Sequence, residues 1–116
     1  MGGERLRSFD AFWQFYLTEH SNRWTRRLHV LGTVGGIAVV VAGVLRGSAV
    51  MVAGGVVLAY GLAWVAHFFI QHNRPATFRH PLWSLRADFR MVAMALTGRL
   101  EAEIARQSAQ SEPDRD

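Results

Sequence analysis

Two long apolar stretches occupy the centre of the chain, and polar residues are concentrated towards its two ends. The first stretch runs from Leu28 to Leu45 and contains no acidic or basic residue except His29. The second runs from Ala49 to Ile70 and contains none except His67. Each is close to the ~20 residues that cross a hydrocarbon core as a helix. The pattern predicts an all-α integral membrane hairpin, with spans at about 28–45 and 49–70 joined by a tight turn at Arg46–Ser48.

A soluble helical bundle with two buried central helices is the alternative to this hairpin. A chain of 116 residues could hardly cover two such apolar stretches on every side, so we favour the membrane. Residues 1–27 are polar, charged and aromatic and lack the apolar core of a secretory signal. We therefore expect the two spans themselves to hold the protein in the membrane.

Arginine residues flank the two stretches unevenly. Only Arg46 lies in the turn, whereas several lie close to the other ends of the stretches: Arg23, Arg26 and Arg27 before the first, and Arg74, Arg79, Arg86 and Arg90 after the second. Because cytoplasmic loops are enriched in basic residues, we expect a multi-pass protein of the cytoplasmic (inner) membrane with both termini in the cytoplasm. The hairpin then brings His29 and His67 to the same cytoplasmic rim.

Composition narrows the partners of the chain. All thirteen basic residues are arginine, which suggests a GC-rich, bacterial genome. The formal net charge of +4 comes from arginines that flank apolar segments, and not from one basic patch interleaved with aromatic residues. We therefore expect an anionic lipid membrane as partner and no nucleic acid. The chain has no cysteine, which excludes disulfides, thiolate metal ligands and a cysteine nucleophile.

Amphipathic helices are expected on both sides of the hairpin, within a single membrane domain of residues 1–107. The first begins after the N-cap Ser8 and ends near His20 at the Ser21–Asn22 break. Its aromatic side chains suit the membrane interface: Phe9, Phe12, Trp13, Phe15 and Tyr16. The second covers roughly Leu82–Arg106, lies along the membrane surface, and has one apolar face: Leu85, Phe89, Val92, Leu96 and Leu100. Residues 108–116 are expected to form a disordered tail.

Small residues recur on one face of each predicted span. Counting in steps of three or four from the histidines gives Gly32, Gly36, Val39 or Val40 and Gly43 in the first span, and Ala63, Ala59 and Gly55 in the second. Small residues let membrane helices approach closely, so these stripes predict the contact between the spans. Each stripe has a histidine at its cytoplasmic end, so His29 and His67 are expected to face each other.

Four histidines are expected at this rim: His20, His29, His67 and His72. Imidazole suits iron, zinc and copper and needs no buried countercharge when neutral, so the cluster is a candidate metal site. A packing role is the alternative for each histidine. His72 follows His67 by five residues, about 140° round a helix, so it reaches the same ion only if the last turn unwinds. His80, between Arg79 and Pro81, is interpreted as a loop residue.

Other chemistries find little support in the sequence. The glycines lie within membrane spans and form no phosphate-binding loop, and no serine has a plausible base and carboxylate beside it. Glu19, next to His20, has two interpretations: a partner that orients an imidazole, or a solvated charge at a helix end.

Two segments, FYLTEHSNRWTRRLHVLGT and AWVAHFFIQHNRPATFRHPLWSLRADFRM, resemble a small membrane-protein family long catalogued as a domain of unknown function. Its fungal members are endoplasmic-reticulum dioxygenases that use Fe(II) to shorten 2-hydroxy fatty acids by one carbon. The resemblance covers about residues 8–92 and follows the spacing of six residues: His20, Asn22, His29, His67, Pro75 and Ala76. Gly32 comes slightly later than the family's glycine. The family commonly has glycine at the position of Ala66 and glutamate at that of Gln71.

The resemblance implies that the histidines bind Fe(II), and that a 2-hydroxy fatty acid and O₂ yield a shorter acid, CO₂ and water. Arg27 and Arg74 are candidate contacts for the substrate carboxylate, as is Asn22 more weakly, although either arginine could equally anchor lipid headgroups. A non-enzymatic membrane interaction protein remains an alternative, as does a carrier with His29 and His67 as axial haem ligands. The short hairpin leaves little room around a haem unless the chain forms a homo-oligomer.

Overall fold

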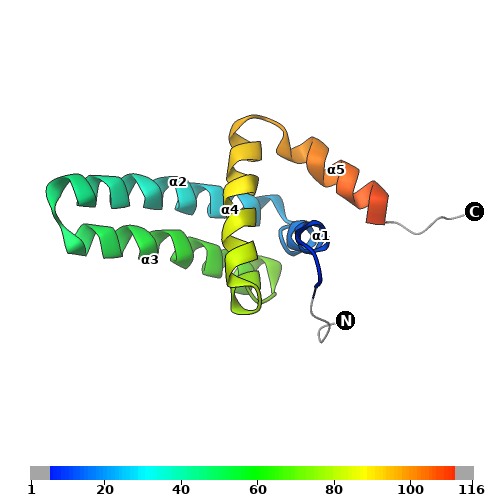
Figure 1. Cartoon of the computed structure of the whole chain (residues 1–116), viewed down its shortest axis with the longest axis horizontal. Helices are drawn as coiled ribbons and strands as arrows, with labels where there is room; N and C mark the ends of the chain where they lie inside the picture. Colours follow the sequence, from blue (N-terminus) through cyan, green and yellow to red (C-terminus); the bar gives the residue numbers. More distant parts are fainter. Residues whose placement is uncertain (1–5, 112–116) are drawn as a thin grey trace, which may run out of the picture. The chain divides into compact units, whose positions relative to one another are not determined.

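The computed structural model describes residues 6–111, and over that range the chain is helical without strands (Figure 1). The elements are α1 (Phe9–Glu19), α2 (Arg23–Arg46), α3 (Ala49–Val65), the π-helix η1 (Ala66–Gln71), the 3₁₀ turn η2 (Ala76–Phe78), α4 (Pro81–Leu96) and α5 (Leu100–Ser111). The prediction of an all-α chain is confirmed. The chain folds as two compact units, Glu19–Pro75 and Met1–Thr18 with Ala76–Asp116, and each is described by itself.

Local capping explains where the two long helices begin and end. The Asn22 side chain accepts a hydrogen bond of 2.8 Å from the Trp24 backbone N–H, which caps α2 at the predicted Ser21–Asn22 break. At its other end Gly47 adopts a left-handed conformation with φ of 65° and returns its N–H to the carbonyls of α2. Ser48 then caps α3 through the Met51 N–H at 3.2 Å. The chain therefore reverses within two residues.

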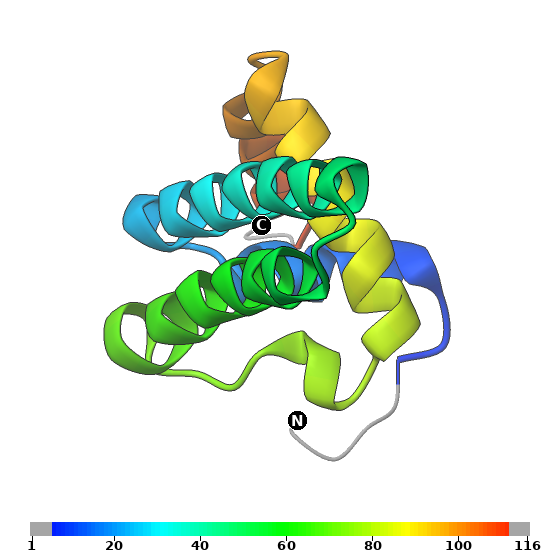
Figure 2. The same cartoon turned by 90° about the vertical axis from the view of Figure 1, so that its left-hand side faces the viewer.

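The stripes of small residues form the contact between α2 and α3, which lie side by side in both views (Figures 1 and 2). A methyl group added at Gly36 would lie 2.6 Å from the Gly55 carbonyl oxygen and 2.9 Å from Ala59 Cβ. One added at Gly55 would lie 2.6 Å from the Gly36 carbonyl oxygen. Only glycine permits this approach of two backbones, and the predicted helix contact is confirmed.

The outer faces of the hairpin are apolar and open. Two helices are long and apolar enough to cross a membrane, Arg23–Arg46 and Ala49–Gln71, and only 22% and 17% of their most apolar windows are buried. A core helix of a soluble protein would be mostly buried instead. Large side chains such as Leu45 (82% exposed) and Val50 (83% exposed) are not covered by any other part of residues 6–111. Lipid tails would cover such faces.

The second unit has its own core, and this corrects the expected role of the α1 aromatic residues. Ser8 caps α1 as predicted, through the Ala11 N–H at 3.1 Å. The core comprises Phe12, Trp13, Tyr16, Leu17, Ala87, Met91 and Leu100. Phe12, Trp13 and Tyr16 are therefore packed against protein, where they were expected at the membrane interface. An apolar helix face can pack against lipid or against other helices, and here α4 and α5 cover the apolar face of α1.

The expected single helix over Leu82–Arg106 is divided in two, which is a second correction. Gly98 has a φ of 73°, a left-handed conformation in which the Arg99 N–H bonds back to the Met94 carbonyl at 2.8 Å. Of the predicted apolar face, Val92 and Leu100 are buried, whereas Leu85, Phe89 and Leu96 are exposed. Helix α5 continues to Ser111, past the expected start of the tail at residue 108, and residues 112–116 lie outside the described part.

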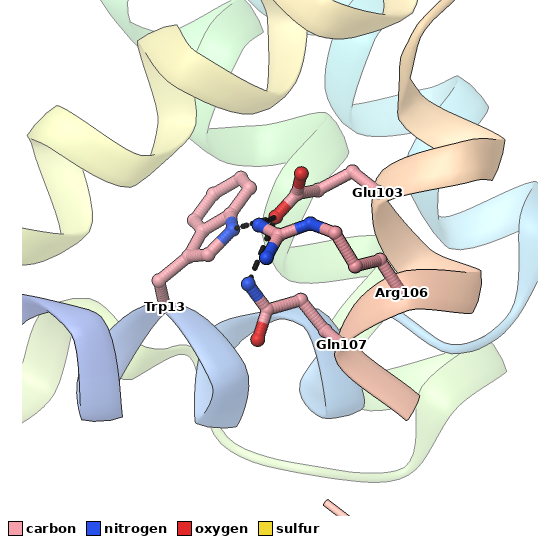
Figure 3. Close-up of polar contacts among 4 residues, drawn as sticks. All are labelled: Trp13, Glu103, Arg106 and Gln107. Carbon is pink, nitrogen blue, oxygen red and sulfur yellow. Dashed lines mark hydrogen bonds and ion pairs between the residues drawn. The ribbon is translucent and has the colours of Figure 1, made fainter. Parts of the chain in front are cut away.

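Polar contacts fasten α5 to α1 (Figure 3). The Trp13 indole N–H donates to Glu103 Oε1 at 3.1 Å, and the same oxygen accepts from Arg106 Nη2 at 2.6 Å and Gln107 Nε2 at 2.9 Å. Burial opposes ionisation of Glu103, but these donors and the Arg106 charge lower its pKa to about 2. The carboxylate is thus held ionised, and it stabilises the docking of α5 above pH ~4.5, the ordinary range of a glutamate.

Candidate functional site

Three buried histidine rings gather within the Glu19–Pro75 unit, one from the segment before α2, one from α2 and one from η1. His20, His29 and His67 are 1%, 5% and 2% exposed. The ring centroids are 5.2 Å apart for His20 and His29, 4.5 Å for His20 and His67, and 6.4 Å for His29 and His67. The three side chains come from segments separated by 8 and 37 intervening residues, so the tertiary fold creates the cluster.

Each ring is brought there by a feature of its own segment. His20 directly follows the end of α1, before the Asn22 cap starts a new helix. His29 lies in the second turn of α2 on the small-residue face. His67 lies in η1, where the second span changes from α to π geometry. Single π turns of this kind are frequent at functional sites because they re-aim a side chain within a helix.

A hydrogen-bond chain leads from His67 to the end of α1. His67 Nδ1 lies 2.7 Å from Asn73 Oδ1. The Asn73 amide nitrogen donates to the Glu19 backbone carbonyl at 3.1 Å and also to the Glu19 side-chain carboxylate. Burial raises the pKa of Glu19, and the Asn73 bond partly offsets that rise. Asn73 thus connects the Glu19 carboxylate to His67, and this contact favours the interpretation of Glu19 as a partner that orients an imidazole.

Gln71 and Arg26 fix the turn that carries His20. The Gln71 side-chain carbonyl accepts from the Asn22 N–H and from Thr25 Oγ1, both at 3.1 Å, and its amide donates to Ser21 Oγ at 2.7 Å. Arg26 is 8% exposed, and its Nη1 donates to the His20 and Ser21 carbonyls at 2.8 and 2.9 Å. The connection between α1 and α2 is thereby held against the end of the second span.

The structure does not bring the other predicted site residues into this cluster. His72 is exposed and has a left-handed backbone, with φ of 59°, at the end of η1. His80 lies in the other unit, against the rings of Phe12 and Trp83. Arg74 and Arg27 are exposed, and the Arg27 guanidinium covers the Trp24 ring at 4.9 Å. The Asn22 side chain caps α2. We expected His72 to reach the same ion only if the last turn unwinds. That turn is indeed a π-helix, but the His72 side chain is exposed.

The three clustered rings fit one metal ion in the chemistry of their donor atoms. Over residues 6–111, no three His, Cys, Asp or Glu side chains already form a metal-binding group. A histidine nitrogen about 2.1 Å from an ion places its ring centroid about 3.3 Å away, so two ligand centroids can lie at most about 6.6 Å apart. All three observed separations lie within this limit. Neighbouring ligands at about 90–110° have centroids about 4.7–5.4 Å apart, so binding an ion would require the His29 and His67 rings, now 6.4 Å apart, to move closer together.

Sequence reasoning missed four residues of this region: Thr25, Arg26, Gln71 and Asn73. Arg26 was interpreted only as a flanking charge, and its bonds depend on the tertiary path of the chain. The quoted segment that ends in Pro75–Ala76 contains both Gln71 and Asn73. Their place in this segment, close to His67, was a signal that they belong to the site. A regular α-helical count from His67, however, places Asn73 on a different face.

Comparison with known proteins gives a family and no individual relative. No curated protein matches the chain, and no solved structure does. The sequence model of the family described as "2-hydroxy-palmitic acid dioxygenase Mpo1-like" matches residues 6–100. That range includes all three clustered histidines, Glu19 and Asn73. This match over most of the chain, together with the histidine spacing, shows that the protein belongs to the Mpo1-like family.

Proposed function

We propose that this protein is an Fe(II)-dependent membrane dioxygenase that shortens 2-hydroxy fatty acids by one carbon. The observation that carries the proposal is the cluster of three buried histidines from three segments, whose ring centroids lie 4.5, 5.2 and 6.4 Å apart. The family description names a 2-hydroxy fatty acid dioxygenase, which supports the substrate class. The apolar outer faces of the hairpin support a lipid environment.

The reaction balances without an added reductant. A 2-hydroxy acid and O₂ give the acid shortened by one carbon, CO₂ and water, and the substrate itself provides the electrons. His20, His29 and His67 would hold the iron as neutral imidazoles, and burial keeps bulk water from them. Iron, when bound, supplies a Lewis acid for the hydroxyl and carboxylate and a centre for O₂ chemistry. Arg27 and Arg74 are candidates to bind the substrate carboxylate, while the acyl chain lies along the spans.

The arrangement of the rings speaks against a haem carrier. Axial ligands stand on opposite faces of the porphyrin, so the space between them must be clear. His20 lies nearer to His29 and to His67 than those two lie to each other. Its ring therefore occupies the region that a haem between His29 and His67 would need. A third nitrogen ligand at that position is useful to a non-haem metal site instead.

Metal analysis of the detergent-purified protein, with a visible spectrum, tests the proposed function. We expect about one iron per chain, no Soret band, and chain-shortened acid formed from a 2-hydroxy fatty acid in step with oxygen consumption. A Soret band would support the haem carrier, and stoichiometric zinc would exclude the oxidation. Absence of any metal, with no activity after anaerobic addition of Fe(II), would favour a non-enzymatic interaction protein.

The orientation of the hairpin gives a second expected result. Because basic residues flank the open end of the hairpin and Arg46 alone lies in its turn, both termini should be cytoplasmic. Reporter fusions at Gly47 and after the C-terminus should therefore report opposite compartments. Equal signals from both fusions would contradict a hairpin that crosses the membrane.

A further inference from the structure

One amide group, that of Asn73, contacts two of the three segments that carry the clustered histidines. Its oxygen faces His67 Nδ1 at 2.7 Å. Its nitrogen donates to the carbonyl of Glu19, the residue bonded to His20, and to the Glu19 carboxylate. Glu19 and Asn73 are separated by 53 intervening residues, so this amide cross-links the end of α1 to the end of the second span.

The partners of the amide decide which way it points. A backbone carbonyl can only accept hydrogen bonds, so the amide NH₂ must face Glu19 whatever the charge on the Glu19 side chain. The amide oxygen, which also only accepts, must then face His67. A 2.7 Å contact between Nδ1 and this oxygen is a hydrogen bond only if Nδ1 carries the proton. A neutral His67 ring therefore has its lone pair on Nε2.

The backbone after His67 is shaped to return Asn73 to this position. The π turn of η1 is followed by His72 in the left-handed conformation, φ 59°. The Asn73 N–H then donates to the His67 carbonyl at 2.8 Å. A left-handed residue other than glycine costs free energy and persists where the surroundings hold it. His72 thus adopts an unfavourable backbone conformation. As a result, Asn73 is hydrogen-bonded to His67 through both its backbone N–H and its side-chain oxygen.

We propose that Asn73 and Glu19 are positioning residues that hold His67 in the Nδ1-protonated tautomer and so reserve Nε2 for the metal ion. This inference rests on the proposed function for the identity of the ion, although the tautomer itself is a property of the metal-free protein. Histidine ligands commonly donate their second N–H to a carbonyl or carboxylate, which fixes ring orientation and raises ligand basicity. Here an asparagine carbonyl performs that role, and Glu19 orients the asparagine.

Asn73→Leu removes the amide at similar side-chain volume. In metal-free protein labelled with ¹⁵N-histidine, the wild-type His67 should show a protonated Nδ1 and an unprotonated Nε2. The variant should shift towards the Nε2-protonated form that free histidine favours. Its affinity for Fe(II), measured by titration, should fall about 10–100-fold, the usual effect of losing such a partner.

A swap of donor and acceptor separates positioning from packing. In Glu19→Gln/Asn73→Asp, the new glutamine amide can donate to one oxygen of the new carboxylate, and the other oxygen still accepts from His67 Nδ1, although the bond to the backbone carbonyl of residue 19 is lost. This double variant should keep the Nδ1-protonated tautomer, and its Fe(II) affinity should exceed that of Asn73→Leu by about tenfold. A purely structural role for Asn73 predicts instead that the His67 tautomer is the same in all three proteins, which would overturn the proposal.

Gln71→Leu is the matched control, because Gln71 ends the same helix and holds the same turn without contacting a histidine ring in the described contacts. It should leave the His67 tautomer unchanged even if the protein is less stable. A shift as large as that of Asn73→Leu would contradict a specific role for Asn73. If the wild type shows the expected tautomer but binds no iron, the proposed function fails while the positioning of His67 stands.

Discussion

Replacing His67 with alanine should abolish both bound iron and the oxidation of 2-hydroxy fatty acids. His67 is 2% exposed, and its ring is the closer of the two neighbours of His20. Loss of a partner that only orients a ligand costs roughly 10–100-fold in metal affinity, and loss of the ligand itself must cost more. Iron should be measured on purified protein, and shortened acid per oxygen consumed on membranes that contain the same variant.

Two histidines outside the cluster provide controls for this result. His80→Ala changes a residue of the other compact unit and should leave both iron and activity largely intact. His72→Gly removes an imidazole while favouring the left-handed backbone found there, so iron should be retained if His72 serves the turn and lost if it is a ligand. Retention of iron and activity in His67→Ala, with only a loss of stability, would return His67 to a packing role.

The hairpin and the meeting of His29 with His67 follow from spacing alone. Apolar length predicts the two helices, and small residues at steps of three or four predict which faces touch. Once those faces are known, a histidine at the end of each stripe must lie beside the other. His20 could be placed because Ser21–Asn22 interrupts the helical pattern, which allows His20 and His29 to converge. These inferences need only local periodicity and one tight turn.

The contacts around Asn73 could not be predicted in the same way. On a regular helix, Asn73 is about 240° from His67 and faces away from it. The π turn and the left-handed His72 bring it back, and neither has a glycine or proline to mark it in the sequence. The α1 aromatic residues pose a different difficulty, because an apolar face has the same composition whether it meets lipid or protein. The helix predicted over Leu82–Arg106 runs through Gly98, and in the structure this left-handed glycine separates α4 from α5.

Gly55→Ala should destabilise the hairpin and weaken iron binding together. The added methyl group would lie 2.6 Å from the Gly36 carbonyl oxygen and 2.9 Å from the Val40 backbone nitrogen, so backbone atoms must move. Overpacking of this kind typically costs about 1–3 kcal/mol. Between membrane helices the loss is direct, since close packing rather than water exclusion holds them together. Unfolding in detergent, followed by circular dichroism, measures the first effect, and Fe(II) titration measures the second.

The neighbouring Gly54→Ala is the matched control, because a methyl group there meets no atom within 4 Å. It should be neutral or slightly stabilising, by up to about 1 kcal/mol from helix propensity. The two variants add the same group to adjacent positions of one helix and differ only in the face that carries it. Iron affinity should fall in Gly55→Ala alone, since separating α2 from α3 also separates His29 from His67. Equal behaviour of the two variants would mean that the stripes do not hold the helices together, and that the histidines do not depend on them for their position.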